Sequence, residues 1–401
     1  MSWEKVLLGD VTDSCLGKML DQEKNRGEYQ PYLANVDVRW GSFNLENLSE
    51  MRFEEGEQER YGLKYGDLVI CEGGEPGRCA IWKEQIPNMK IQKALHRVRV
   101  RDCLDYRYLY YWFLLSGKTG VLEQYFVGAT IKHMPGQKLK SIVIDRPPIE
   151  IQKHIADILS AYDDLIENNR RQIKLLEEAA QRLYKEWFVD LRFPGWETTP
   201  ITDGVPEGWK IKCMADVCDS IGGGTPSTKN DAYYRDGKIR WVTPTDITKN
   251  NGLILLDTEK KITEEGLRSS SAKMVPPYTI LMTSRASIGF FGLCEHEVCT
   301  NQGFISCVPY QENVRFYLLY NLINRVDEIR TKASGSTFLE ISKRTFRDLQ
   351  IILPTEDILD KFTELLCPLV QQMRAHTKSI RKLQEARDRL LPKLMSGEIE
   401  L

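Results

Sequence analysis

The sequence predicts an α+β protein with two mixed α/β domains, a pair of long antiparallel coiled-coil helices that separates them, and an internal two-fold repeat. Three observations predict this architecture. Residues 151–188, in the middle of the 401-residue chain, contain no Gly or Pro, which indicates one long helix. A similar segment returns at residues 358–395, 207 positions later. The two segments also share one pattern of apolar positions, as two strands of a coiled coil would.

The repeat extends beyond the helices. "GATIKHMPGQKLKSIVIDRPP" begins at Gly128 and "GSTFLEISKRTFRDLQIILP" begins at Gly335. Pro147 and Pro354 close these stretches at the same offset of 207, and "WEKVLLGDV" near the start matches "WKIKCMADV" at an offset of 206. A fixed period of about 200 residues indicates two copies of one structural unit, each a mixed domain followed by a long helix.

The order of segments predicts the domain boundaries. We expect a first mixed domain at 1–148, a central long helix at 149–189, a linker at 190–208, a second mixed domain at 209–354 and a C-terminal long helix at 355–401. The linker is rich in Pro, Gly and Thr, which is typical of a non-helical crossover.

The long helices are predicted to pair with each other. The linker delivers the chain to the second domain at the far end of the first helix, so the second helix has to run back, antiparallel to the first. Every seam position in one helix lies 207 residues from its counterpart in the other, with the alternating three- and four-residue steps of a coiled coil. The polar residues Asn169 and His376 fall near the helix midpoints, where a polar pair would fix the register. The predicted helix-pairing residues are Ile155, Ile158, Tyr162, Asn169, Ile173, Leu176 and Leu183 in the first helix, and Phe362, Leu365, Leu369, His376, Ile380, Leu383 and Leu390 in the second.

Each mixed domain shows the same order of shorter elements. Residues 65–83 and 278–294 each predict two strands around a turn. Residues 104–117 and 313–330 each predict a helix with a buried apolar or aromatic face.

Composition excludes several classes of protein. The 55 basic residues nearly cancel the 57 acidic ones, but residues 91–140 hold nine Lys or Arg against three acids, a local net charge of 9 − 3 = +6 that suits phosphate or a solvated face. No apolar run approaches the ~20 residues of a membrane span, and the N-terminus is not a signal peptide. Ten cysteines without a C-x-x-C pair indicate reduced thiols in a cytoplasmic protein.

The sequence predicts no catalytic or metal site. "IGGGTPSTK" lacks the G-K-[ST] of a phosphate-binding loop, and five scattered histidines form no triad pattern. Cys294, His296 and Cys299 have no partner pair with ligand spacing, so buried strands are expected there rather than a metal ion.

The chain resembles the specificity subunit of Type I restriction–modification systems. The motifs that carry the resemblance are "GGTPSTK", "IRWVTPTDI", "MTSRASIG" and "TNQGFIS" in the second domain, together with "PPIEIQKHIADIL" and "RLYKEWFVDLRFPG" at the joints. Together with the repeated arrangement of a mixed domain followed by a long helix, the resemblance covers essentially the whole chain. The first domain diverges most from the family.

The resemblance implies a function for each part. The mixed domains would be target recognition domains that each read one half of a bipartite, asymmetric double-stranded DNA site, and the helices would set the distance between the halves. Two methyltransferase subunits would dock on the helices and flip the target adenine, and restriction/translocase subunits would join them. The chain itself would be non-catalytic and hold no cofactor, since S-adenosylmethionine, ATP and Mg would bind the partner subunits. No membrane would be involved.

This function predicts two kinds of DNA contact. Phosphate anchors are expected among the exposed cations, which we predict to be Lys93, Arg97, Arg99, Lys132 and Lys138 in the first domain and Lys229, Lys343 and Arg344 in the second. Base readers need paired donors and acceptors on exposed loops, and the candidates are Arg39, Asn44 and Arg78 in the first domain and Thr225, Ser227, Thr245, Arg285 and Gln302 in the second. For each single residue, the alternative is an ordinary surface or turn-stabilising role.

Two other functions stay open at this point. The chain could be the DNA-reading part of a fused restriction–methylation polypeptide, although no nuclease or methyltransferase segment occurs in it. It could also be a coiled-coil scaffold with two protein-binding heads, which predicts no affinity for DNA and no salt-dependent binding.

Overall fold

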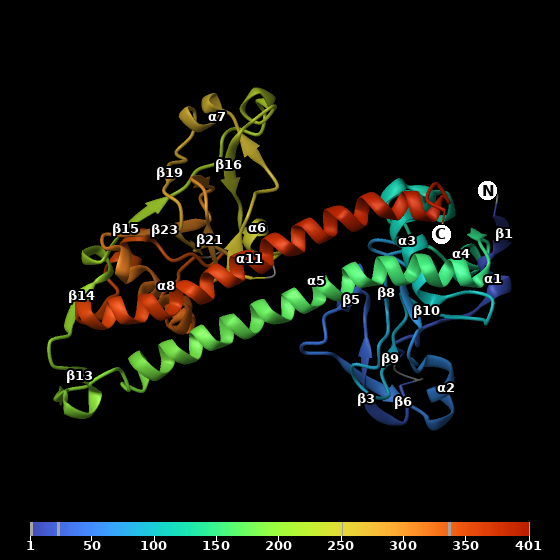
Figure 1. Ribbon diagram of the computed structural model, residues 1–401, viewed down its shortest axis with the longest axis horizontal. Helices are drawn as coiled ribbons and strands as arrows, with labels where there is room; N and C mark the ends of the chain where they lie inside the picture. The colour runs from blue at the N-terminus through green and yellow to red at the C-terminus, as the bar shows by residue number, and fades with distance from the viewer. Residues whose placement is uncertain (1–2, 22–24, 251, 336–337, 401) are drawn as a thin grey trace. The chain divides into compact units, whose positions relative to one another are not determined.

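The computed structural model describes residues 3–21, 25–250, 252–335 and 338–400 (Figure 1). The chain divides into two compact units. Unit 1 consists of Met1–Leu165 and Leu383–Leu401, and unit 2 consists of Ile166–Lys382. Each unit therefore contains one mixed domain together with part of each long helix.

Unit 1 is built on a four-stranded antiparallel sheet and a smaller three-stranded sheet. The larger sheet has the order β2-β10-β7-β8, and the smaller has the order β6-β3-β9. A separate pair, β1 and β11, closes the domain next to the long helix. The strands are β1 (Glu4–Leu7), β2 (Thr12–Leu16), β3 (Glu28–Leu33), β4 (Val38–Arg39), β5 (Ser42–Phe43), β6 (Glu50–Phe53), β7 (Leu68–Cys71), β8 (Cys79–Ile81), β9 (Lys90–Ile91), β10 (Leu95–Val100) and β11 (Val143–Arg146).

Unit 2 repeats this plan. Its larger sheet has the order β15-β23-β20-β21-β17, its second sheet has the order β18-β16-β22-β19, and β14 pairs with β24 as β1 pairs with β11. In the smaller sheets β3 pairs parallel with β9 and β16 pairs parallel with β22. The strands are β12 (Ile201–Thr202), β13 (Val205–Pro206), β14 (Lys210–Cys213), β15 (Cys218–Gly222), β16 (Ile239–Val242), β17 (Ile254–Leu255), β18 (Lys261–Ile262), β19 (Met274–Val275), β20 (Ile280–Thr283), β21 (Phe291–Cys294), β22 (Val298–Thr300), β23 (Phe304–Pro309) and β24 (Gln350–Leu353).

Some of the shorter helices are also repeated, since α10 lies 207 positions after α4. In unit 1 the helices are α1 (Leu8–Val11), α2 (Gln58–Tyr61), α3 (Tyr106–Thr119) and α4 (Gly136–Lys140). In unit 2 they are α6 (Pro244–Thr248), α7 (Glu264–Arg268), α8 (Arg315–Asn324), α9 (Val326–Thr331) and α10 (Lys343–Arg347). The helix expected at 313–330 is thus divided into α8 and α9 at Arg325. Within the described residues, none of the helices combines the length and the apolar composition that a membrane span needs.

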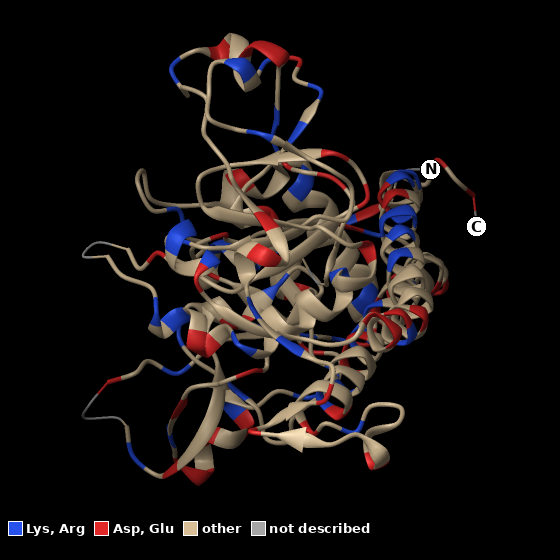
Figure 2. Ribbon diagram, turned by 90° about the vertical axis from the view of Figure 1, so that its left-hand side faces the viewer, with Lys and Arg blue, Asp and Glu red and all other residues tan. Residues whose placement is uncertain are grey.

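The long helices are α5 (Ile149–Tyr184), which ends in a π-helical turn at Lys185–Val189, and α11 (Glu356–Met395). α11 continues through Pro368 and Pro392 without a break. Figure 1 shows α5 and α11 running beside each other, and Figure 2 shows basic and acidic residues mixed along both.

The two helices are antiparallel in each unit. In unit 1 the start of α5 and the end of α11 belong to one buried cluster, with Ile155 and Leu159 from α5 and Leu391 from α11. In unit 2 the end of α5, at Tyr184, shares a buried cluster with Phe362 near the start of α11. In each unit both helices pack on the mixed domain as well as on each other, so the amphipathic stripe is wider than a coiled-coil seam.

The wide buried face accounts for one wrong assignment in the predicted seam. Leu365 is 49% exposed, and the buried residues around it are Leu366 and Val370, which pack in the core of the second domain. Ile155, Ile173 and Phe362 are buried. The other apolar seam residues are partly buried, namely Ile158, Tyr162, Leu176, Leu183, Leu369, Ile380, Leu383 and Leu390.

The polar pair expected at the helix midpoints is present in unit 2. Nδ1 of His376 lies 2.7 Å from Oδ1 of Asn169, and both side chains are partly buried. With Nδ1 protonated, the imidazole donates to the amide oxygen. This contact fits one register of the two helices, because a shift of one turn would leave both polar groups against apolar neighbours.

A buried carboxylate ties the second domain to α11. Glu295, after β21, is 10% exposed and forms ion pairs with Arg374 and with Lys378, whose Nζ lies 2.9 Å from Oε2. Burial raises the pKa of the Glu295 carboxyl, but the Lys378 ammonium and the Arg374 guanidinium outweigh burial and hold that pKa below its ordinary value. On α5, Oε1 of Glu177 accepts a hydrogen bond from the Leu253 backbone N–H at 2.8 Å.

The Glu295 contact predicts a pH-dependent contribution to stability. Because the pKa is lower in the folded state, the ionised carboxylate stabilises the fold above the unfolded pKa of ~4.3, and the contribution is lost as pH falls through the lower folded pKa. We expect E295Q to lower the free energy of unfolding at pH 7 and to match the wild type more closely near pH 3. Urea unfolding at several pH values measures this, with exposed Glu297→Gln as the control. An equal loss at every pH would contradict the prediction.

Candidate nucleic-acid interface

One edge of the large sheet in unit 2 gathers seven of the eight DNA-binding residues predicted in the second domain. β23 pairs antiparallel with both β15 and β20, with Gly222 opposite Ile305 and Thr283 opposite Phe304. The ends of β15 and β20 therefore meet the start of β23 at this edge. Four segments lie at this edge, namely residues 223–229 after β15, 284–287 after β20, 301–303 before β23, and 338–344. We call them together the loop edge of unit 2.

Backbone hydrogen bonds join the segments of this loop edge. The Ser284 N–H donates to the Gly303 carbonyl at 2.8 Å, and the Ile341 N–H donates to the Ser284 carbonyl at 3.0 Å. The hydroxyl of Thr225 donates to Oε1 of Gln302, so two predicted base readers from distant parts of the chain lie side by side.

The glycine-rich loop in unit 2 is shaped by packing. A Cβ at Gly223 would lie 2.1 Å from the Thr300 carbonyl oxygen, and one at Gly224 would lie 2.4 Å from Oγ of Ser271. Only glycine permits this approach, which leaves Thr225, Ser227 and Lys229 exposed beyond it. Two side chains also hold the backbone of this loop. The Trp241 indole donates to the Gly224 carbonyl at 3.0 Å, and the Tyr234 hydroxyl donates to the Pro226 carbonyl at 2.6 Å.

The loop edge of unit 2 is cationic. Lys229, Lys343 and Arg344 are exposed, and in the part of the chain that the structure describes none of the three has an acidic partner. Nε of Arg285 lies 3.6 Å from Oε2 of Glu340, and the guanidinium carbon of Arg285 lies 5.9 Å from the centre of the Phe338 ring. Thr245 is exposed on α6, next to Pro244, which packs against Gly303.

Unit 1 builds the same loop edge with different residues. The Glu72 N–H donates to the Ala94 carbonyl at 2.8 Å, and the Met134 N–H donates to the Glu72 carbonyl at 2.7 Å, which repeats the two bonds around Ser284. A Cβ at Gly17 would lie 2.4 Å from the Gln92 carbonyl oxygen, so this position excludes a side chain just as Gly223 does in unit 2. Residues 17–20, 72–78, 92–94 and 131–138 form the loop edge of unit 1.

Three predicted phosphate anchors lie on the loop edge of unit 1. Lys93, Lys132 and Lys138 are exposed, and the Nζ of Lys132 lies 3.6 Å from Oε2 of Glu123. Arg39 and Asn44 are exposed too, but they make local contacts around β4 and β5. The Arg39 guanidinium donates to the carbonyls of Val36 and Val38, and Oδ1 of Asn44 accepts from the Glu46 N–H.

Two predicted phosphate anchors of the first domain, Arg97 and Arg99, are engaged inside the fold instead. Arg97 is 4% exposed and donates to Oδ2 of Asp13 at 2.6 Å. Arg99 forms two parallel hydrogen bonds, of 2.7 Å each, with the buried carboxylate of Asp67. Both arginines project from the same face of β10, where these acids neutralise them, so that placement does not suit phosphate anchors.

Arg78 is held by Asn35 and by Glu75 of its own loop. Its guanidinium donates at 3.0 Å to the backbone carbonyl and to Oδ1 of Asn35, and at 3.1 Å to Glu75. Asn35 in turn donates to the Gly73 carbonyl at 2.8 Å. Arg78 therefore stabilises the turn between β7 and β8, which is the turn-stabilising role that the sequence left as the alternative to a base contact.

Sequence reasoning missed an apolar hairpin tip on each loop edge. Reciprocal backbone hydrogen bonds close the hairpins at Val127 with His133, 2.8 and 3.0 Å, and at Ser334 with Glu340, 3.0 and 2.9 Å. Both turns begin with a glycine at positive φ, where a Cβ would lie within 2.2 Å of a backbone carbonyl oxygen. The tips expose Ile131 by 74% and Phe338 by 55%. The signal was in the repeat, since "GATI" and "GSTF" place an apolar residue three positions after glycine in both copies.

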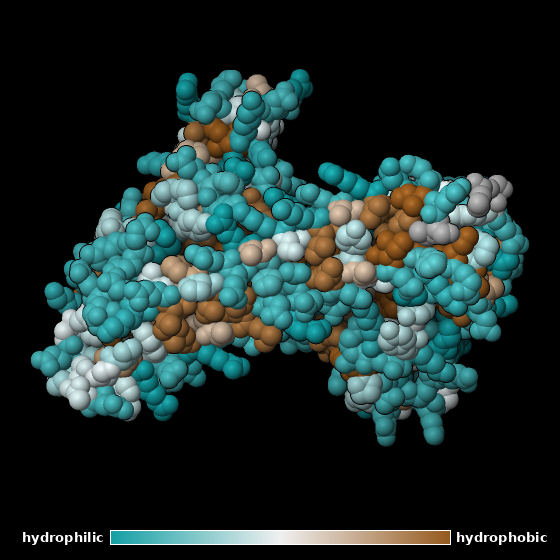
Figure 3. Space-filling model, viewed as in Figure 1, coloured by the Kyte–Doolittle hydropathy of each residue, from teal (hydrophilic) through white to brown (hydrophobic). Residues whose placement is uncertain are grey.

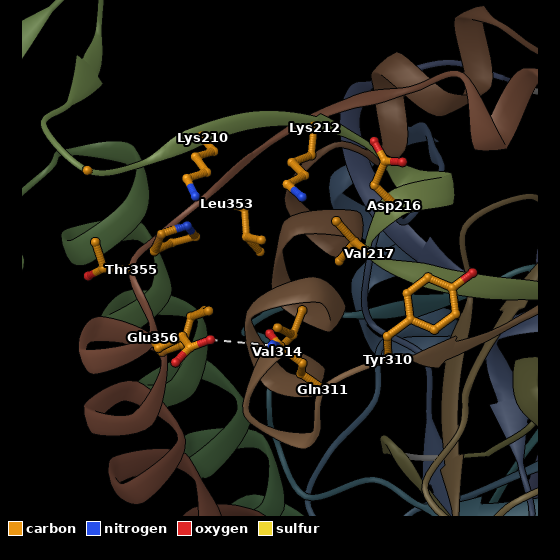
Figure 4. A pocket seen from close by; sticks show the side chains of 13 residues that line it. Lys210, Lys212, Asp216, Val217, Tyr310, Gln311, Val314, Leu353, Thr355 and Glu356 are labelled. Atoms are coloured by element: carbon orange, nitrogen blue, oxygen red, sulfur yellow. Dashed lines mark hydrogen bonds between the residues drawn. The ribbon is translucent and has the colours of Figure 1, made fainter.

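A hollow of about 550 Å³ lies at the opposite edge of the large sheet in unit 2, at the start of α11. Figure 4 shows Lys210 and Lys212 extending from β14 beside it, and Gln311 donating to Glu356 at 3.4 Å. Within the described residues neither lysine has an acidic partner. The hollow is distinct from the loop edge and brings together none of the predicted site residues.

Comparisons with known proteins agree with the repeated architecture. The family model described as the Type I restriction modification DNA specificity domain matches the chain twice, over residues 1–178 and 206–384. The chain is 26% identical, over 92% of its length and 85% of the relative, to the Type I restriction enzyme MjaIX specificity subunit of Methanocaldococcus jannaschii. It is 24% identical, over 99% of both chains, to the HindI specificity subunit of Haemophilus influenzae.

The fold is also found in a solved structure. The crystal structure of a Type-I restriction-modification system S subunit from M. genitalium aligns with a TM-score of 0.56 at 17% identity, over 98% of this chain and 96% of that one. The family model matches one mixed domain and most of one long helix in each copy. The protein therefore belongs to the family of Type I restriction–modification DNA specificity subunits.

Proposed function

We propose that the chain is the non-catalytic subunit that reads a bipartite, asymmetric DNA site for a Type I restriction–modification system. The observation that carries the proposal is the loop edge, which both units build with the same backbone hydrogen bonds but with different side chains. A constant frame with variable side chains is what two readers of different half-sites need.

Each loop edge offers the chemistry of a DNA contact. Lys229, Lys343 and Arg344, which have no acidic partner among the residues that the structure describes, suit phosphates, since they neutralise charge without reading sequence. Thr225 and Gln302 present hydroxyl and amide groups that match the donors and acceptors of base edges. Lys93, Lys132 and Lys138 supply the corresponding charge on unit 1.

The long helices would set the gap between half-sites and dock two methyltransferase subunits. α5 has 36 residues, a length of roughly 54 Å at ~1.5 Å per residue. On its side in unit 2 lies a hollow of about 360 Å³ whose lining is half apolar, from Leu175, Ala179 and Leu183, and half charged, from Glu178, Arg182 and Glu186. Figure 3 shows hydrophobic surface along the long helices, which is suited to a partner protein. Restriction/translocase subunits would complete the assembly, and S-adenosylmethionine, ATP and Mg would bind the partners.

The test is to co-express the chain with its methyltransferase subunit and to sequence host DNA for methylated adenines. We expect one split motif with two fixed halves and a constant gap. Exchanging residues 1–148 for another first domain should change one half of the motif only. A pair that assembles without methylating such a motif would favour the scaffold function and overturn the proposal.

The hairpin tips give a prediction that is separate from charge. We expect F338A to weaken binding to the cognate DNA by about 5- to 100-fold, as for the loss of one aromatic contact with a base. The dependence of affinity on salt should stay the same, because no charge is removed. Fluorescence anisotropy over a salt series measures both. Tyr310→Ala, at the opposite edge of the same sheet, is the matched control, and equal losses in both variants would contradict the prediction.

A further inference from the structure

The two copies of the repeat differ in charge where Asp163 and Arg387 lie in the long helices. In unit 1, Asp163 of α5 and Arg387 of α11 form an ion pair, and the Tyr111 hydroxyl donates to Asp163 at 2.7 Å. The offset of 207 maps Asp163 onto Val370 and Arg387 onto Ala180. In unit 2 both of those residues lie in the apolar core, at 6% and 0% exposure.

Two tyrosine hydroxyls show which positions of α3 and α8 are equivalent. Tyr108 in α3 donates to the carbonyl of Asp145 at 2.7 Å, and Tyr317 in α8 donates to the carbonyl of Ile352. The acceptors lie on β11 and β24, the matching edge strands of the two units, and are 207 positions apart. Positions of α3 therefore correspond to positions of α8 that are 209 residues later.

The same correspondence pairs Tyr111 with Tyr320. Tyr320 is buried, and within the described residues its hydroxyl has no hydrogen-bond partner. Tyr111 has the carboxylate of Asp163 in this place, whereas Tyr320 shares its core with Val370 and Ala180. The second copy thus retains the tyrosine but has an apolar pair where the first has an ion pair.

In unit 1 the ion pair is part of a chain of contacts. The Arg387 side chain is 13% exposed and also contacts Oδ1 of Asp388 at 2.9 Å. Oδ2 of Asp388 lies 2.6 Å from Nζ of Lys118 on α3. A partly buried arginine with these partners loses much of its compensation when Asp163 is replaced by an apolar neighbour.

The repeat makes an alternative pairing conceivable, in which α5 of one chain pairs with α5 of a second copy and the two α11 helices do the same. In that arrangement Asp163 would face Ala180 of the other copy, and Arg387 would face Val370. Each charge would lose its partner across the helix pair, which is unfavourable at partly buried positions. The midpoint pair does not discriminate in this way, since Asn169 can hydrogen-bond to a second asparagine.

We propose that Asp163 and Arg387 select the pairing of unlike helices, so that α5 accepts α11 of its own chain and rejects α5 of a second copy. The apolar pair of Ala180 and Val370 supplies packing at the equivalent place without a charge to satisfy. Under the proposed function this selection has a consequence: unlike pairing keeps two different recognition domains in one particle, whereas like pairing would present identical domains and a palindromic site.

The experiment makes the helix pair symmetric in the full-length chain. The variant D163V/R387A gives both ends of the helix pair the residues of unit 2, and D163R/R387D exchanges the charges but keeps the ends different. Asn169→Cys is added to each variant and to the wild type, because positions 169 of two chains meet only when like helices pair. Light scattering gives the molar mass over a concentration series, and mass spectrometry after treatment with a short thiol crosslinker identifies a link between positions 169.

We expect the symmetric variant to form dimers with the 169–169 link, and the wild type and the charge-exchanged variant to lack that link. A folded symmetric variant with the molar mass of the wild type and no 169–169 link would overturn the proposal. No DNA or methyltransferase is involved, so this result is independent of the proposed function.

A second test covers a symmetric variant that fails to fold. The single variant D163R has an arginine at both positions 163 and 387, and the single variant R387D has an aspartate at both. Like charges therefore meet within each chain, whereas unlike charges meet when a helix of one variant pairs with a helix of the other. Co-expressed with different tags, they are expected to copurify in a 1:1 complex, while neither copurifies with a differently tagged copy of itself. Absence of the 1:1 complex, with both chains present in soluble form, would overturn the selection of helices by this pair.

Discussion

Replacing Lys229, Lys343 and Arg344 together by alanine is expected to lower the affinity of the assembled methyltransferase for its DNA site by about 100-fold at 0.15 M salt. The three cations lie on the loop edge of unit 2 and have no acidic partner among the described residues, so their charge is available to phosphates. Each phosphate contact adds about 0.9 to the slope of log affinity against log salt, and the slope should therefore fall by about 2.7. Anisotropy titrations between about 0.05 and 0.3 M salt measure the affinity and its slope against salt.

The chain offers a matched control for this loss of charge. Lys210 and Lys212 lie beside the hollow at the opposite edge of the sheet, and Lys361 is on the early turns of α11. Replacing these three lysines removes the same charge from the same unit, so affinity and slope should change far less. The melting temperatures of both triple variants should match that of the wild type, since none of the six side chains is buried. Equal losses of affinity would mean that the loop edge is not the DNA contact.

Phe362→Ala is expected to destabilise unit 2 by about 3–5 kcal/mol. Phe362 is fully buried on α11, with its ring centre 4.8 Å from that of Phe188 and 5.7 Å from that of Trp187. Its removal leaves a cavity where α11, the end of α5 and the second domain pack together. Because unit 2 has about 200 residues, the melting temperature of its transition should fall by roughly 10 °C, as calorimetry would show.

Leu365→Ala is the control, three residues along the same helix. Leu365 is half exposed, so its truncation should cost about 0.5 kcal/mol or less. The periodicity of the sequence assigned both residues to the helix seam, and the two variants therefore separate seam position from actual burial. Comparable destabilisation by the two substitutions would contradict the packing described for α11.

The organisation of the chain was predictable because it rests on comparisons of the sequence with itself and on local periodicity. A segment without Gly or Pro and with a regular apolar pattern forms a helix largely irrespective of its surroundings. The contact between Asn169 and His376 followed from the same reasoning, since an antiparallel pair of repeated helices brings equivalent midpoints together. Seven of the eight candidates in the second domain lie in the loop edge, and five of them belong to the motifs "GGTPSTK", "MTSRASIG" and "TNQGFIS" that carry the family resemblance.

The placement of individual side chains was decided by tertiary structure. Arg97 and Arg99 belong to a basic stretch, but β10 pairs with β2 and β7, and this pairing sets Asp13 and Asp67 against them. Those acids are 84 and 32 positions away from the arginines that they neutralise, a separation that no local pattern reveals. Likewise, the ion pair of Asp163 with Arg387 needs two helix ends 224 positions apart. Periodicity determines which face of an element is apolar; the groups that meet a charged side chain are determined only when distant strands and helices come together.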